Sequence, residues 1–222
     1  MNRNSFYGYV GRGLPRPVIG GWFKAQERYV LQVDEAPWAF NERASISQLA
    51  AGCWLAGGSA LEEFSTSKGH HDRRYLCGRT GRGDVYLSLG DNDYTCEAKW
   101  CQTAVPLPPH WDPETTVLVL KKHLLAAAHD AYVLDSYWSG RRRSLLFASI
   151  YFNQKVKAQF GVSEVQLLLS TAKKHLGRIG ATGMAWYFWK PWMSPEACAK
   201  IGGKWDAAMG NLLFIGGARR KK

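Results

Sequence analysis

The sequence predicts an α/β protein in which a mixed central sheet is flanked by helices. The main observation is that helix and strand signals alternate, in the order helix, three strands, helix, strand, helix, strand, helix. Strands separated by helices favour a sheet covered by helices. The second observation is the composition, with 46% hydrophobic and 21% charged residues, which is typical of a globular chain. A length of 222 residues suffices for one core.

The chain is interpreted as one domain, 1–222, with three parts. Residues 1–40 start with many glycines and prolines and are expected to form an irregular, basic arm or a loose edge hairpin. Residues 41–152 contain the helix, three-strand meander, helix and strand of the expected core. Residues 153–222 contain the remaining helix and strand signals and are expected to form a C-terminal α/β extension.

The first helix of the core is expected to begin after Asn41, because asparagine is a favourable N-cap. Apolar residues then recur at helical spacing until Gly57 and Gly58 end the pattern. A short second helical turn is expected over residues 60–64.

The three strands of the meander are expected at residues 74–79, 84–89 and 94–102. Residues 80–83 and 90–93 join them and are rich in glycine, aspartate and asparagine. These residue types at hairpin length indicate tight turns, so the three strands should be antiparallel to their neighbours.

The second half of the chain is expected to alternate helices and strands. A long helix should cover 112–134, because Asp-Pro-Glu at its start supplies a cap, a first-turn proline and a favourable charge. A buried central strand should follow at 144–152. A capping box opens a helix over 163–177, a strand follows at 185–189, and a last helix should start near Ser194.

The charge balance indicates a polyanionic partner. The chain has 29 Lys and Arg against 18 Asp and Glu, a formal net charge of +11. Phosphates attract such a surface, and the counterions that they release favour binding. The sequence contains no P-loop, no GxSxG motif and no GxGxxG motif, which disfavours nucleotide hydrolysis, acyl transfer and dinucleotide binding.

The candidate catalytic residues are Asp84, Glu97 and Lys99. Side chains alternate along a strand, so Glu97 and Lys99 should point to the same face. Asp84 starts the preceding strand, and a hairpin would bring it close to Glu97. Two converging carboxylates suit a hard divalent cation, and a neighbouring lysine can orient water or offset charge on a phosphate.

This arrangement resembles the PD-(D/E)XK nucleases, the restriction-endonuclease-like superfamily, over residues 41–152. The resemblance implies that Asp84 and Glu97 bind Mg²⁺, with Mn²⁺ as a substitute, and that Lys99 assists the attacking water. It therefore implies a metal-dependent endonuclease that hydrolyses phosphodiester bonds, with DNA as the preferred substrate. Gly83 departs from the motif, whose name has proline at this position.

Further residues are expected to support this site. Members of the family often have a glutamate on the first helix near the metal, which makes Glu42 the candidate here, with Glu62 and Glu63 as rivals. Gln102, three residues after Lys99, is a candidate for binding phosphate or water.

Five arginines are candidates for binding the nucleic-acid backbone. Arg79 and Arg82 lie next to the expected turn before Asp84, and a run of three precedes the expected central strand, Arg141, Arg142 and Arg143. Guanidinium groups suit phosphate contacts. A solvated turn is the alternative interpretation of the run.

Two other functions stay open at this point. The chain could bind nucleic acid without catalysis, or it could be an assembly subunit that uses the helix near 112–135 as an interface. A homodimer is compatible with the nuclease, since double-strand cleavage often uses two sites. The five cysteines, and a start that lacks a secretory pattern, lead us to expect an intracellular, cytoplasmic protein without a membrane segment.

Overall fold

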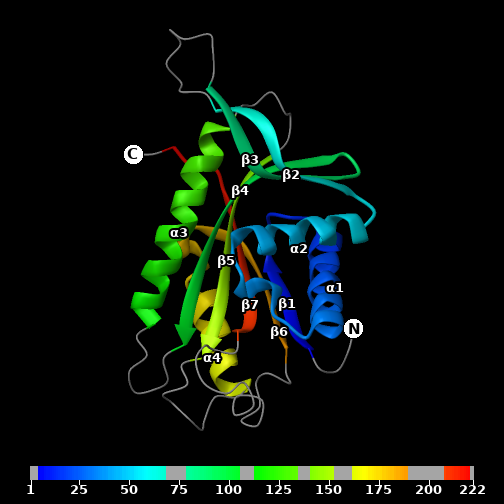
Figure 1. Ribbon diagram of the computed structural model, residues 1–222. Helices are drawn as coiled ribbons and strands as arrows, with labels where there is room; N and C mark the ends of the chain where they lie inside the picture. Colours follow the sequence, from blue (N-terminus) through cyan, green and yellow to red (C-terminus); the bar gives the residue numbers. More distant parts are fainter. Residues whose placement is uncertain are drawn as a thin grey trace.

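The computed structural model describes residues 5–68, 79–105, 113–134, 141–152, 162–189 and 208–220. They form an α/β architecture in which helices cover a mixed seven-stranded sheet (Figure 1), as the sequence predicts. In the described part of the chain, no helix is both long and apolar enough to cross a bilayer.

The sheet has the strand order β1-β6-β7-β5-β4-β3-β2. Its strands are β1 (Ser5–Gly11), β2 (Ser59–Lys68), β3 (Arg79–Leu89), β4 (Asn92–Val105), β5 (Arg141–Phe152), β6 (Ala181–Trp189) and β7 (Ala208–Gly217). Strands β4 and β5 are parallel, and all other neighbours are antiparallel. A parallel pair needs a long crossover connection, and the helix between β4 and β5 lies in this connection.

The helices lie in two layers, one on each face of the sheet. They are α1 (Arg16–Val33), the 3₁₀ turn η1 (Pro37–Ala39), α2 (Glu42–Leu55), α3 (Pro113–Val133), α4 (Val162–Lys174) and the short α5 (Leu176–Ile179). Buried residues of α1, η1 and α2 pack on one face, and those of α3, α4 and α5 on the other.

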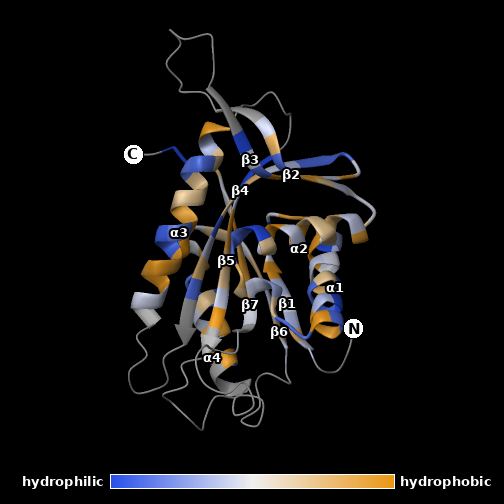
Figure 2. Cartoon of the chain, viewed as in Figure 1, coloured by the Kyte–Doolittle hydropathy of each residue, from blue (hydrophilic) through white to orange (hydrophobic). Residues whose placement is uncertain are grey.

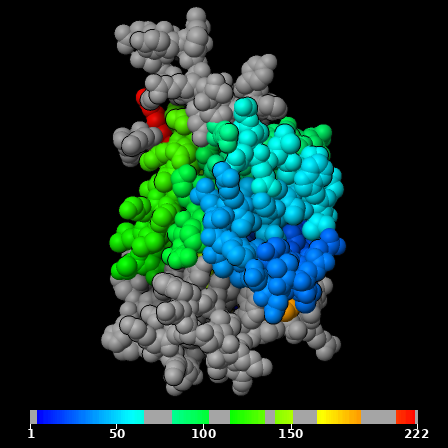
Figure 3. All heavy atoms as spheres, viewed as in Figure 1, coloured from blue at the N-terminus to red at the C-terminus, as the bar shows by residue number. Residues whose placement is uncertain are grey.

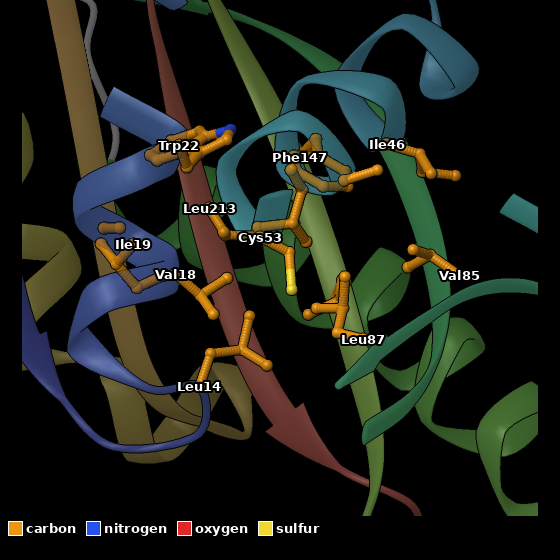
Figure 4. Packing of buried hydrophobic residues seen from close by; sticks show 14 of the residues in the cluster. Leu14, Val18, Ile19, Trp22, Ile46, Cys53, Val85, Leu87, Phe147 and Leu213 are labelled. Carbon is orange, nitrogen blue, oxygen red and sulfur yellow. The ribbon is translucent and has the colours of Figure 1, made fainter. Parts of the chain in front are cut away.

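The first of the two cores lies between the sheet and the helices α1 and α2 (Figure 4). Trp22 of α1, Phe147 of β5 and Leu213 of β7 are fully buried in it. Burial of such a side chain stabilises the fold by about 1.5–3 kcal/mol. The two helices cross at Gly21 and Gly52, where a Cβ on Gly21 would lie 2.0 Å from the Gly52 oxygen. Glycine is therefore required for this close approach.

The second core lies under α3 and α4 and contains Leu124, Leu169 and Phe214. The ribbon of α3 carries both hydrophobic and hydrophilic residues (Figure 2), as expected for a helix with one buried side. The long helix and the buried central strand β5 that the sequence predicts are both confirmed, although β5 begins three residues earlier, at Arg141.

The N-terminal segment corrects one prediction, because it is not an irregular arm. Residues 5–11 form the edge strand β1, which pairs with β6, and residues 16–33 form a helix of the first core. Pro17 is compatible with this helix because it lies in the first turn, where no intrahelical N–H bond is lost. Gly21, one of the glycines that suggested a loop, is instead required by helix packing.

The meander β2-β3-β4 is antiparallel, as predicted, but its first strand lies elsewhere. Residues 59–68 form β2, where a helical turn was expected at 60–64. Residues 80–83, expected to form a turn, belong to β3. Most of the first strand expected at 74–79 lies outside the described residues. The second turn is confirmed, since Gly90 and Asp91 join β3 to β4 and Gly90 has a φ of 58°.

The C-terminal part also differs from its prediction. Ser163 lies inside α4 instead of capping it, and the helix breaks at His175 before the short α5. The strand β7, inserted between β5 and β6, was not predicted. The helix expected from Ser194 lies outside the described residues.

Candidate active site

The candidate site lies where β3 and β4 separate. Their pairing runs from Leu89–Asn92 to Val85–Cys96, and one step further the same register places Asp84 opposite Glu97. Residues directly opposite each other in an antiparallel pair point to the same face of the sheet. The two carboxylates predicted from the sequence therefore share one face, the face that α3 covers.

Asp84 is anchored to β4 by a hydrogen bond. The backbone N–H of Ala98 donates to Asp84 Oδ2 at 2.7 Å. The backbone pairing of β3 with β4 has ended at this point, so the Ala98 N–H of β4 has no carbonyl of β3 opposite it. The Asp84 carboxylate accepts this N–H in place of that carbonyl. Because Ala98 is fully buried, an unsatisfied N–H there would be costly, which ties the position of Asp84 to the stability of β4.

Glu97 lies in the middle of β4, opposite Ser144 of the parallel strand β5. It is only 2% exposed. Removal of a carboxylate from water is unfavourable unless donors, a cation or a proton compensate for the lost hydration. Glu97 is therefore a buried carboxylate on the face that the register gives it in common with Asp84.

Lys99 lies two residues further along β4, on the same face as Glu97. Its Nζ forms an ion pair with Asp130 Oδ2 of α3 at 2.8 Å, and the two side chains are 32% and 45% exposed. Burial alone lowers the pKa of Lys99. The ion pair with Asp130 and the charges of Glu42 and Asp84 outweigh burial, so the pKa is raised overall. Lys99 is therefore a fixed cation among carboxylates.

Glu42 also reaches this site, from the start of α2. The Asn41 side chain caps the helix by accepting the N–H of Ala44 at 2.9 Å, as the sequence predicts. Burial raises the pKa of Glu42. The Lys99 charge lowers it, Asp84 raises it, the Trp100 backbone N–H lowers it through a hydrogen bond, and Asp130 raises it. Glu42 is thus close enough to Lys99 and Asp84 for their charges to shift its pKa.

The rivals of Glu42 have other partners. Glu62 accepts a hydrogen bond from Ser47 of α2 at 2.7 Å, and Glu63 forms ion pairs with arginines. Gln102 is exposed, and alternation along β4 places it on the face opposite to Lys99. The structure therefore brings Glu42 to the other site residues, but not Gln102.

Asp130 is the site residue that the sequence interpretation missed. It is the only acidic residue between Glu114 and Asp135, in a stretch that is otherwise apolar or basic. A lone acid in such a helix is a recognisable signal. However, helical spacing does not indicate which strand residue lies opposite it.

Gly83, which stands where the motif's name has proline, lies under an aromatic ring. A Cβ at this position would lie 2.3 Å from the ring of Phe64 on β2. The Phe64 ring also makes an edge contact with Tyr86. The residue before Asp84 is therefore small because an aromatic ring covers it.

Two of the candidate arginines make contacts within the protein. Arg142 Nη1 donates to the backbone oxygens of Tyr132 at 2.7 Å and Leu134 at 3.1 Å, and so caps the end of α3. Arg143 Nε donates to the Gly13 oxygen at 2.9 Å. These bonds give both arginines a structural role. Binding of the nucleic-acid backbone by these arginines is a prediction that the bonds do not test.

The other candidate arginines lie at or near the surface. Arg141 is exposed at the start of β5. Arg82 lies on β3, two residues before Asp84, and forms an ion pair with Glu63 at 3.2 Å. Arg79 lies further out on the same strand, and its side chain is outside the described ones.

The donor set fits a magnesium ion held by two carboxylates. Within the described ranges, no group of three or more His, Cys, Asp or Glu side chains is arranged to hold a metal. Magnesium does not need such a group, because it keeps several waters and usually takes one or two protein carboxylates together with substrate phosphate. Asp84 and Glu97 carry carboxylate oxygens of this kind.

The fold and the site define an α/β protein with a cluster of carboxylates and one lysine at a break in its sheet. Comparison with protein-family models, curated proteins and solved structures gives no match.

Proposed function

We propose that this protein is a Mg²⁺-dependent nuclease of the restriction-endonuclease-like kind, which hydrolyses phosphodiester bonds of DNA at Asp84, Glu97 and Lys99. The main support is the 2.7 Å bond from Ala98 to Asp84, which holds this carboxylate where the register brings it opposite Glu97. The order α2, β2-β3-β4, α3, β5, with β5 parallel to β4, agrees with the order that the resemblance implies.

Each residue of the site has a role in this proposal. Asp84 and Glu97 would hold the metal, and a bound Mg²⁺ makes a coordinated water more acidic and offsets charge on the phosphate. Lys99 is a cation held by Asp130, so it stabilises negative charge that develops on the phosphate oxygens instead of accepting a proton. Because burial raises its pKa, Glu42 is a better proton acceptor than an ordinary carboxylate.

The first experiment measures cleavage of supercoiled plasmid, single-stranded DNA and RNA with Mg²⁺, Mn²⁺ or EDTA. We expect the wild type to cut in either metal and not in EDTA. Asp84→Asn and Lys99→Met should each abolish cutting. Asp91→Asn is the matched control, because it makes the same change in the exposed turn of the same hairpin and should cut like the wild type.

Two other results would change the interpretation. Cutting by Asp84→Asn at the wild-type rate would show that the site is assigned wrongly. Salt-sensitive binding of DNA by a wild type that does not cut would favour a nucleic-acid-binding protein without catalysis. Manganese binding, followed by electron paramagnetic resonance, tests the metal site without substrate, and Asp84→Asn should weaken it while Asp91→Asn should not.

A further inference from the structure

Two exposed arginines share one carboxylate next to the candidate site. Glu63 Oε1 lies 2.7 Å from Arg43 Nη2, and Glu63 Oε2 lies 3.2 Å from Arg82 Nη1. The arginine side chains are 77% and 73% exposed, and that of Glu63 is 39% exposed. A guanidinium has five N–H donors, and each ion pair here involves one terminal nitrogen. Both arginines can therefore bind a further anion while they stay paired with Glu63.

The backbone of β2 is distorted at Glu63 in a way that creates this arrangement. Successive residues of a strand normally point to opposite faces. Here Glu62 contacts Ser47 of α2, and the next residue, Glu63, contacts Arg43 of the same helix. Glu63 has a φ of 49°, in the left-handed region. The positive φ breaks the alternation, so that two consecutive glutamates reach α2.

Stability alone does not account for the distortion. A non-glycine residue in the left-handed region is strained, and such residues concentrate at functional sites. The compensation at Glu63 consists of exposed ion pairs, which contribute little net stability in water. Glu63 fills no core, since its side chain is partly exposed. The strained position therefore serves to hold the two guanidinium groups.

The arginine pair lies at the edge of the candidate site. Arg43 follows Glu42 in α2, and Arg82 lies two residues before Asp84 in β3. The β2–β3 register places Glu63 directly opposite Asp84. In the space-filling view, α2 lies between α3 and β2 on one face of the molecule (Figure 3). The arginine pair joins α2 to the strands β2 and β3, and the Lys99–Asp130 ion pair joins β4 to α3.

We propose that Arg43 and Arg82, held in place by Glu63, bind a backbone phosphate of the nucleic acid close to the phosphate that is cut. The inference rests on the proposed function for its substrate class. The two guanidinium groups carry two positive charges against one negative charge, so the cluster attracts a phosphodiester. A bidentate guanidinium contact matches the geometry of its oxygens.

The test measures binding of labelled double-stranded and single-stranded DNA in EDTA, by fluorescence anisotropy over a series of salt concentrations. Arg43→Gln and Arg82→Gln should each weaken binding by about tenfold, as expected for loss of a charged hydrogen bond. Each should also reduce the salt dependence by about one counterion. Arg28→Gln removes the same charge from an exposed position of α1 and should leave both quantities unchanged.

Glu63→Gln separates an ordered arginine pair from simple charge attraction. The variant gains one net positive charge, so long-range attraction alone predicts tighter binding. Loss of the carboxylate that holds the arginines predicts weaker binding, which is the result we expect. Far-ultraviolet circular dichroism should show that each variant is folded.

The inference is overturned if Arg43→Gln and Arg82→Gln bind like Arg28→Gln, or if Glu63→Gln binds more tightly than the wild type. It is also overturned if the wild type binds neither form of DNA at low salt. The proposed function is judged separately, by metal-dependent cutting in the wild type and its loss in Asp84→Asn. A protein that cuts DNA but ignores these arginines would refute the inference and leave the nuclease intact.

Discussion

Asp84 has two roles in the structure, and two substitutions separate them. Its carboxylate accepts the N–H of the buried Ala98, and it is also one of the two proposed metal ligands. Asp84→Ala removes both roles. Asp84→Asn keeps a side-chain oxygen that accepts the Ala98 bond, but loses the negative charge that a metal needs.

The size of each effect follows from this hydrogen bond. A buried N–H left without an acceptor costs about 1–3 kcal/mol, so Asp84→Ala should lower the free energy of unfolding by that amount. For a chain of this length, each kcal/mol lowers the melting temperature by about 2–4 °C. Asp84→Asn should melt within a few degrees of the wild type, and neither variant should cut DNA with Mg²⁺.

Thermal unfolding by circular dichroism and the plasmid assay together check this reasoning. Equal melting temperatures for the two variants would show that the Ala98 bond does not hold Asp84. Cutting by either variant would remove Asp84 from the catalytic site. A large loss of stability in Asp84→Asn would show that the charge itself is needed for folding.

Three further predictions concern the helices, the lysine and the alkaline limit of stability. Gly21→Ala should lower the free energy of unfolding by about 3 kcal/mol, because its Cβ would lie 2.0 Å from a backbone oxygen of α2. Gly20 has open space around it, so Gly20→Ala should raise the free energy of unfolding by about 0.5–1 kcal/mol. Chemical unfolding measures both changes. Asp130→Asn should change the free energy of unfolding by under about 1 kcal/mol, because the ion pair is partly exposed. It should reduce the cleavage rate about tenfold or more, because Lys99 loses the partner that positions it. A cleavage rate equal to that of the wild type would contradict this role. Burial and the Glu27 charge raise the pKa of Tyr187 above its usual value. As the pH rises above about 10, this tyrosine therefore ionises first in the unfolded chain, and the free energy of unfolding falls. The melting temperature of Tyr187→Phe should therefore decrease less than that of the wild type between about pH 8 and pH 11.

Residues with unambiguous local signals were predicted correctly. Asn41 caps α2, Gly90 forms the β3–β4 turn, and Val117, Leu120 and Leu124 of α3 pack in the second core. In each case one local rule decides the structure, namely capping, positive φ or helical periodicity. The parallel pairing of β4 and β5 requires a crossover, which the intervening helix provides.

The elements that were missed depend on contacts far along the chain. Helix α1 contains Gly20 and Gly21, and without knowledge of its packing against α2 these glycines indicate a loop. Strand β7 is buried on both faces, with Leu212 and Leu213 in different cores, so it shows neither alternation nor helical spacing. Residues 60–64 contain good helix formers, and pairing with β3 overrides this preference.

The placement of the candidate site residues was predictable in part. Asp84, Glu97 and Lys99 could be found because alternation and a short hairpin suffice to place them on one face. Glu42 was selected only through the family resemblance, and the structure places it beside Lys99. Asp130 could not be matched to Lys99, because the pairing of a helix with a strand depends on how α3 packs across the sheet.

The break in the sheet is the feature that no local pattern could reveal, and the proposed site lies at this break. A regular sheet would pair β3 with β4 along its whole length, so that the Ala98 N–H would bond to the backbone of β3. Instead, Asp84 lies opposite Glu97 where the β4 pairing ends, and opposite Glu63 where β2 adopts a positive φ. The Asp84 carboxylate then accepts the Ala98 N–H that backbone pairing would otherwise bond, and Glu63 reaches Arg43 of α2. The proposed metal ligand Asp84 and the residue that holds the proposed phosphate contact, Glu63, therefore come from two irregular positions that the β2–β3 register places opposite each other.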